Sequence, residues 1–177
     1  MVKKNVAMGR GSDSAAGAGS ATARNGGMRV MFDASALVKR YASEAGRDRV
    51  LALFDAAGEL LVAAHCHSEV ASALLRRRRE GSLPSAEFDR AWSVAQRDVA
   101  DMVRVPLDRQ VERCAIAAME HGPLRVVDAL HVGSALVAGV DLFVTADRRQ
   151  AQAARGLGLQ TECLGAQTSV SEKRLLA

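Results

Sequence analysis

Apolar positions follow two different spacings along most of this chain. Continuous apolar runs of strand length occupy residues 29–32, 59–64 and 141–145, and residues 103–106 and 160–164 are weaker strand candidates. Between these runs, apolar residues recur at the spacing of a helix face. This second pattern predicts helices at residues 35–41, 46–57, 68–80, 86–102 (with Ser85 as its N-cap), 109–120, 126–137 and 147–158.

The alternation of strands and helices predicts the fold class. Consecutive parallel strands need crossover connections, and these place helices on both faces of the sheet. The 177 residues suffice for one core but not for two comfortable ones. We therefore expect one domain of the α/β class, with three α/β/α layers around a central, mainly parallel sheet of four to five strands.

Residues 1–27 and 166–177 stand outside this pattern. The first segment is rich in Gly, Ala and Ser without a sustained hydrophobic period, so it cannot bury enough apolar surface to offset its ordering entropy. We expect a disordered tail and, because Met28 directly precedes the first strand, an artefact of start-site assignment or cloning. Residues 166–177 form a C-terminal tail without an interpretable signal, which leaves 28–165 as the folded domain.

The distribution of charge weakens a first impression of a polyanion-binding protein. The net charge is +4, but residues 1–27 contribute +3 of it, and residues 28–177 carry 20 basic and 19 acidic side chains, or +1. Nucleic-acid binding therefore depends on local clusters, such as the arginines at 76–79. These four span a full helical turn, and a solvated surface stripe is their simpler explanation. With 3% aromatic residues, no stacking platform for bases is visible.

Cysteine usage and hydropathy predict a cytoplasmic protein without membrane contact. Cys66, Cys114 and Cys163 are far apart and odd in number, which favours neither a disulfide framework nor a zinc site and fits a reducing compartment. No apolar stretch approaches the roughly 18 residues of a membrane span. The N-terminus also lacks the apolar core of a secretory signal.

Four acidic residues occupy related places in the predicted fold. Asp33 directly follows the first strand, Glu69 and Asp147 come shortly after two others, and Asp128 opens a predicted helix. The carboxyl ends of parallel strands lie at one edge of a sheet, where open α/β proteins bind ligands. We therefore expect Asp33, Glu69 and Asp147 to meet at this edge, with Asp128 brought in by its helix.

Each of these acids also has a purely structural explanation. Asp33 and Asp147 are suited to cap helices, and Glu69 and Asp128 to interact with a helix dipole. Taken singly, these explanations are the simpler ones, but clustering is costly, because two carboxylates about 4 Å apart repel by roughly 4 kcal/mol. Shared protons can neutralise such a cluster, whereas a ring of oxygen ligands without Cys or His suits Mg²⁺ or Mn²⁺.

Three segments that contain these acids resemble a known family. "MFDASALVKRYASEAG", "HSEVASALLRR" and "VVDALHVGSALVAGVDLFVTADRRQAQAARGLGL" are similar to successive sequence blocks of the PIN-domain ribonucleases, in particular the VapC toxins of VapBC toxin–antitoxin systems. The resemblance covers about residues 28–164 and includes all four acids in order. It implies a PIN-like fold in which Asp33 and Asp128 are the principal metal ligands, and Glu69 and Asp147 complete the catalytic site directly or through water.

Several polar neighbours complete the expected site. The resemblance implies that Ser35 and Thr145 orient ligands or substrate, and it has one departure, because family members often carry an aromatic residue where this chain has Ala146. His131 shares a helical face with the third acid and can hydrogen-bond substrate or a ligand carboxylate, although a satisfied, partly buried histidine is the simpler explanation. Arg148 directly follows the fourth acid and adds phosphate-attracting charge.

These observations predict a Mg²⁺- or Mn²⁺-dependent endoribonuclease, in which an activated water attacks an RNA phosphodiester in line and leaves a 5′-phosphate and a 3′-hydroxyl. The resemblance implies a small VapB-like antitoxin as partner, with its C-terminal segment in the acidic cleft, and a homodimer. One alternative is a catalytically silent PIN-like RNA-binding or scaffold module, which an intact quartet argues against. Another is an acid-rich phosphohydrolase, which would normally need a second aspartate where this chain has Ser35.

Overall fold

The computed structural model describes residues 27–42 and 44–165. The two predicted tails, apart from Gly27, lie outside the described residues. All predicted elements are present, and their ends differ from the predicted ones by at most two residues. In chain order the elements are β1 (Arg29–Phe32), α1 (Ala34–Tyr41), α2 (Arg47–Ala56), β2 (Glu59–Ala63), α3 (Cys66–Arg79), α4 (Ser85–Asp101), β3 (Val103–Val105), α5 (Arg109–Glu120), α6 (Val126–Ala138), β4 (Leu142–Thr145), α7 (Arg148–Gly156) and β5 (Thr161–Cys163).

The five strands form one sheet in the order β3-β2-β1-β4-β5, and every neighbouring pair is parallel. Strand β1 lies at the centre, where Met31 is aligned with Leu61 of β2 on one side and with Phe143 of β4 on the other. The predicted parallel sheet is therefore confirmed, and both weaker strand candidates belong to it as edge strands.

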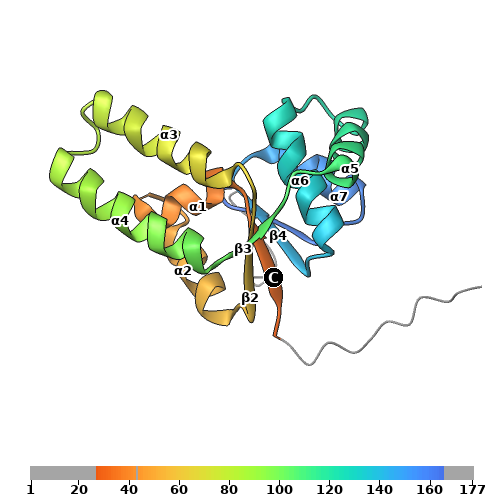
Figure 1. Cartoon of the computed structure of the whole chain (residues 1–177), viewed down its shortest axis with the longest axis horizontal. Coiled ribbons are helices and arrows are strands. Elements are labelled where there is room, and N and C mark those ends of the chain that lie inside the picture. The colour runs from red at the N-terminus through yellow and green to blue at the C-terminus, as the bar shows by residue number, and fades with distance from the viewer. Residues whose placement is uncertain (1–26, 43, 166–177) are drawn as a thin grey trace, which may run out of the picture.

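Helices cover both faces of this sheet, as the sequence predicts (Figure 1). Side chains alternate along β1, so that Val30 and Phe32 join a core with α1–α4, whereas Met31 joins a second core with α5–α7. Because successive strand residues point to opposite faces, one strand supplies both cores. The result is the expected three-layer α/β/α arrangement.

The starts of α3 and α4 differ from the prediction for reasons that the structure shows. Helix α3 begins at Cys66, two residues early, because the buried side chains of Cys66, Val70 and Leu74 form one continuous apolar stripe at a spacing of four residues. The prediction of Ser85 as a cap is wrong. Ser85 is the first residue of α4, and the capping position is held by Pro84, which makes no side-chain hydrogen bond.

The connections after β1 and β4 place the candidate site. The chain passes from β1 to α1 on one face and from β4 to α7 on the other. Such a change of direction between neighbouring strands opens a crevice at their carboxyl ends.

In the described part of the chain, no helix has both the length and the apolar character of a membrane span.

Candidate active site

Asp33 lies at the carboxyl end of β1, where the strand passes into α1. It is only 1% exposed, and its Oδ1 caps α1 by accepting a 2.8 Å hydrogen bond from the backbone N–H of Ala36. Its Oδ2 accepts from the hydroxyls of Ser35 at 2.7 Å and Thr145 at 2.9 Å. The capping explanation is therefore correct for one oxygen, and the other oxygen accepts hydrogen bonds from side chains of α1 and β4.

The surroundings of Asp33 are unfavourable for its negative charge. Burial raises the pKa of the Asp33 carboxyl above its usual value, while the charge of His131 and the hydrogen bonds from Ser35, Ala36 and Thr145 act in the opposite direction. Within the described residues, no Lys, Arg or His forms an ion pair within 4.0 Å of Asp33. A buried carboxylate without a cationic partner is costly, and a bound cation would remove that cost.

Gln150 joins Asp33 to Asp128. It lies in the first turn of α7, 3% exposed, and its Nε2 donates to Asp33 Oδ2 at 3.0 Å and to Asp128 Oδ1 at 3.1 Å. Those two distances together limit the separation of the carboxylate oxygens to about 6.1 Å. The amide oxygen of Gln150 is buried and has no hydrogen-bond partner among the described residues. The two acids form an all-oxygen pair of ligands that fits Mg²⁺ or Mn²⁺.

Two hydroxyl groups connect the corner between β4 and α7 to Asp33. Thr145 accepts from the backbone N–H of Asp147 at 3.0 Å, Ser35 accepts from the same corner at 2.9 Å, and both donate to the Asp33 carboxylate. The side chain of Asp147 caps α7 by accepting from the backbone N–H of Arg149 at 2.7 Å. The backbone of Asp147 is thus tied to Asp33, while its carboxylate is engaged with its own helix.

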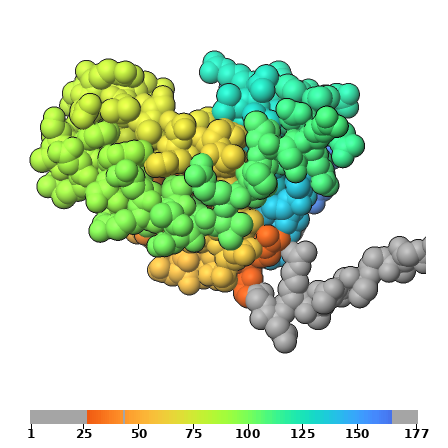
Figure 2. Space-filling model, in the orientation of Figure 1, coloured from red at the N-terminus to blue at the C-terminus, as the bar shows by residue number. Residues whose placement is uncertain are grey.

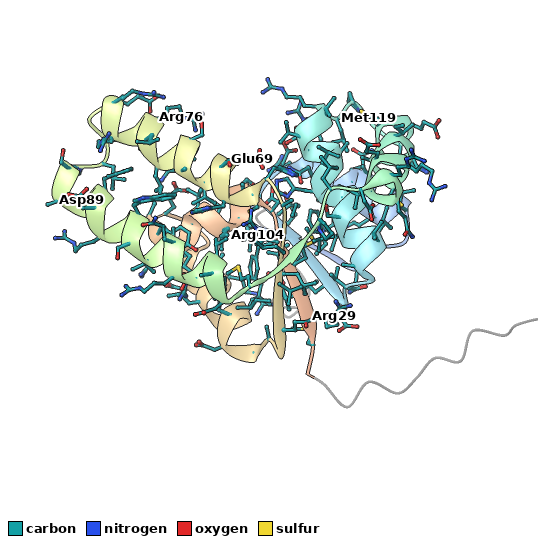
Figure 3. The ribbon with its side chains drawn as sticks, viewed as in Figure 1. Arg29, Glu69, Arg76, Asp89, Arg104 and Met119 are labelled. Carbon is teal, nitrogen blue, oxygen red and sulfur yellow. The ribbon has the colours of Figure 1, made fainter. Side chains whose placement is uncertain are left out.

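Glu69 lies beside this group but contacts two histidines. Its Oε2 is 2.5 Å from Nε2 of His131 on α6 and 3.5 Å from Nε2 of His65, which precedes α3. His131 is 1% exposed, and the contact with a carboxylate that the sequence suggested for it is present. Figure 3 places Glu69 at the start of α3, facing the opening between α3 and α6, and Figure 2 shows that the surface is hollowed there.

The surroundings of the His65 imidazole favour its neutral form. Burial lowers the pKa of His65, and the charge of His131 lowers it further, while Glu69 acts in the opposite direction. The two rings lie 4.4 Å apart between centroids and are tilted by 52°. His65 is therefore neutral near pH 7, because even its ordinary pKa is about 6.5.

The arginines at 76–79 take part mainly in contacts within the protein. Arg77 forms an ion pair with Glu44, and the guanidinium of Arg78 lies 4.3 Å from the ring centroid of Phe88. The end of α3 also borders a cleft of about 920 Å³ against α4 and the end of α1. Its basic lining consists of Arg40, Arg47, Arg76, Arg77 and Arg90.

The four predicted acids do not form one tight ring. Asp33 and Asp128 share a hydrogen-bond donor, Asp147 is linked through its backbone, and Glu69 lies with the histidines. Arg148 is exposed at the first position of α7. The catalytic and metal-binding roles of these residues stay predictions.

Sequence reasoning missed two members of this constellation. Gln150 is a polar residue on the buried face of α7, beside Ala153 and Ala154, and this interruption of an apolar stripe was a visible signal. His65 precedes Glu69 by four residues, which is the spacing of neighbours on one helix face.

Comparisons with known proteins agree with the fold. Residues 30–156 match the family model of the PIN domain. Ribonuclease VapC45 of Mycobacterium tuberculosis is 34% identical over 135 residues, which cover 73% of this chain and 91% of that protein.

Two solved structures share the fold. VapC20 of Mycobacterium tuberculosis, a sarcin-ricin loop cleaving toxin, matches with a TM-score of 0.54 at 13% identity, over 73% of this chain and 95% of that one. VapBC2 of Rickettsia felis, bound to a DNA fragment from its promoter, matches with a TM-score of 0.55 at 11% identity. The match covers 77% of this chain and 98% of that one. The family model and the sequence relative carry the assignment further: this chain belongs to the PIN domain family and, within it, to the VapC ribonucleases.

Proposed function

We propose that this VapC ribonuclease is a Mg²⁺- or Mn²⁺-dependent endoribonuclease and that Asp33 and Asp128 hold its ion. The observation that carries the proposal is the bridge between these two acids. A buried carboxylate and a second acid lie with their bridged oxygens at most about 6.1 Å apart, and neither has an ion-pair partner among the described residues. Hard oxygen ligands favour Mg²⁺ and Mn²⁺ over softer ions.

The surrounding residues prepare the site for phosphodiester hydrolysis. A bound ion supplies an activated water and neutralises charge on the phosphoryl group. Ser35 and Thr145 hold the Asp33 carboxylate in one orientation. His131 holds one oxygen of Glu69, whose side chain is 32% exposed and can accept a hydrogen bond from a water at the crevice. In-line attack on RNA would leave a 5′-phosphate and a 3′-hydroxyl.

Replacement of either proposed ligand tests this function. Asp33→Asn and Asp128→Asn should each lower the rate of RNA cleavage by roughly 10²–10³-fold or more, because Asn keeps the shape but removes the charge. Asp89→Asn, an exposed position on α4 far from the crevice (Figure 3), is the matched control and should retain full activity. Products are followed by mapping new 5′-phosphate RNA ends.

The metal requirement is tested separately. Cleavage should stop in EDTA and return with Mg²⁺ or Mn²⁺, while cleavage that persists in EDTA would refute the metal mechanism. RNA binding without cleavage in any of these ions would favour the catalytically silent PIN-like module instead.

The partner that fits this site is a small VapB-like antitoxin. Family membership supports this, and a cationic residue of its C-terminal segment would offset the uncompensated charge of Asp33 and Asp128. Co-expression of the neighbouring short reading frame should give a complex that inhibits cleavage, and light scattering tests the expected homodimer. The cytoplasmic location stays a prediction.

A further inference from the structure

A second group of potential metal ligands lies beside Asp33 and contains two nitrogens. His65, Glu69 and His131 each offer one ligand atom within 4.8 Å of the other two. Within the part of the chain that the structure describes, no other group of three or more His, Cys, Asp or Glu side chains is this close. The cluster therefore differs from the all-oxygen pair of Asp33 and Asp128 in its chemistry.

Two of the three ligand pairs can be compared with the spacing in a four-coordinate ion, and all three pairs lie within 4.8 Å. With metal–ligand bonds of about 2.0–2.1 Å, two ligands of a tetrahedral ion lie roughly 3.3 Å apart. His65 Nε2 and Glu69 Oε2 are already separated by 3.5 Å, whereas His131 Nε2 and Glu69 Oε2 are at 2.5 Å. The second pair must open by roughly 0.8 Å to admit an ion, and a carboxylate that is 32% exposed has room for this movement.

Unsatisfied atoms in the cluster also indicate a ligand. Nε2 of His65 is buried and has no hydrogen-bond partner among the described residues. Nδ1 of His131, which is almost fully buried, also has no hydrogen-bond partner there. Buried polar atoms are normally paired, and an ion would satisfy the His65 nitrogen.

We propose that His65, Glu69 and His131 bind a transition-metal ion of the Zn²⁺ class, and that this ion inhibits RNA cleavage by withdrawing Glu69 from the active site. Two imidazoles and one carboxylate form a set that zinc accepts, with a fourth position left for water. Imidazole nitrogen selects Zn²⁺ over Mg²⁺, and the neighbouring oxygen-only pair has the opposite preference. The inhibitory part rests on the proposed function, while the binding part does not.

Binding is tested with Co²⁺ as a visible stand-in for Zn²⁺. The full chain carrying Asp128→Asn, which weakens the oxygen-only pair, is stripped with EDTA and titrated with Co²⁺. One equivalent should bind with the visible absorption of a four-coordinate nitrogen and oxygen site, and Zn²⁺ should displace it. In the same background, His65→Gln and His131→Gln should each lower the affinity for Zn²⁺ at least about tenfold.

His67→Gln is the matched control, because His67 is also on α3 but stacks on Trp92 at 4.9 Å, outside the cluster. This variant should bind Zn²⁺ like the unchanged background. Circular dichroism checks that each variant folds, and His65, whose side chain is 23% exposed, is the position least prone to misfolding. Equal Zn²⁺ affinity in all three histidine variants, or no four-coordinate absorption, would overturn the site.

Inhibition is measured on the chain with its four acids intact. Zn²⁺ should suppress Mn²⁺-supported cleavage, and His65→Gln should need at least about ten times more Zn²⁺ for the same fractional inhibition. If Co²⁺ binds at the cluster but RNA is not cleaved under any condition, the metal site is supported and the proposed function is rejected. Cleavage that Zn²⁺ does not affect, with no cobalt bound, rejects the metal site and leaves the proposed function standing.

Discussion

Gln150 offers the sharpest test of how the two acids are held together. In the Gln150→Leu variant a side chain of similar size replaces the amide, so both hydrogen bonds, of 3.0 Å to Asp33 and 3.1 Å to Asp128, are lost. Hydrogen bonds to charged groups are worth about 1.5–3 kcal/mol each. Removal of the unpartnered amide oxygen stabilises the folded protein by about 1–3 kcal/mol, because a buried polar atom without a partner is no longer present. The expected net loss of metal-free stability is about 2–3 kcal/mol.

A second route gives a similar magnitude. Two unit charges separated by the upper limit of about 6.1 Å repel by roughly 3 kcal/mol at an effective dielectric constant near 20. The amide donors offset this repulsion in the metal-free protein, and a divalent ion would do the same. In saturating Mn²⁺ the difference between Gln150→Leu and the unchanged protein should therefore fall below about 1 kcal/mol.

Linkage gives the corresponding change in metal affinity. A stability difference that shrinks by 2 kcal/mol on metal binding corresponds to roughly 30-fold tighter Mn²⁺ binding by the variant. Urea unfolding near pH 8, in EDTA and in Mn²⁺, measures the stabilities, and calorimetric titration measures the affinity. Gln152→Leu, on the exposed face of the same helix, should change stability by less than about 0.5 kcal/mol in both buffers. Equal destabilisation of Gln150→Leu with and without Mn²⁺ would refute the reasoning.

Two further predictions concern stability. Gly133→Ala should destabilise the protein by about 1–3 kcal/mol, because a Cβ there would lie 2.6 Å from the carbonyl oxygen of Val111 and 2.8 Å from the backbone nitrogen of Ala115, so α5 and α6 would have to separate. Gly122→Ala, with nothing within 4 Å, is its control in thermal unfolding. In EDTA, the raised folded-state pKa of Asp33 stabilises the fold at acid pH, and this contribution is lost as pH rises through that pKa. The stability of Asp33→Asn, which cannot ionise, should therefore rise relative to that of the unchanged protein as pH rises from about 4 to 8, and parallel stability profiles would contradict the assignment.

The elements of the fold could be predicted because they depend on local periodicity. A strand and a helix place their apolar residues at spacings of about 2 and 3.6 positions, and the runs at 29–32 and 141–145 and the helical patterns between the strands carry these spacings without ambiguity. Alternation of the two types then leaves little choice but a parallel sheet between helix layers. The ends of the elements could be predicted less closely. Cys66 packs as an apolar residue, so α3 begins there, before the polar residues at 67 and 68.

The candidate site was only partly accessible from the sequence. Spacing along one helix fixes which residues are neighbours, so the proximity of His65 to Glu69 was available from the sequence. Contacts between elements depend on how helices dock across the carboxyl edge of the sheet, which no local pattern specifies. The tertiary structure alone therefore decided that Gln150 lies between Asp33 and Asp128, and that His131 meets Glu69. The sequence by itself determined the layers and brought the acids to one edge, and packing decided which neighbour each acid has.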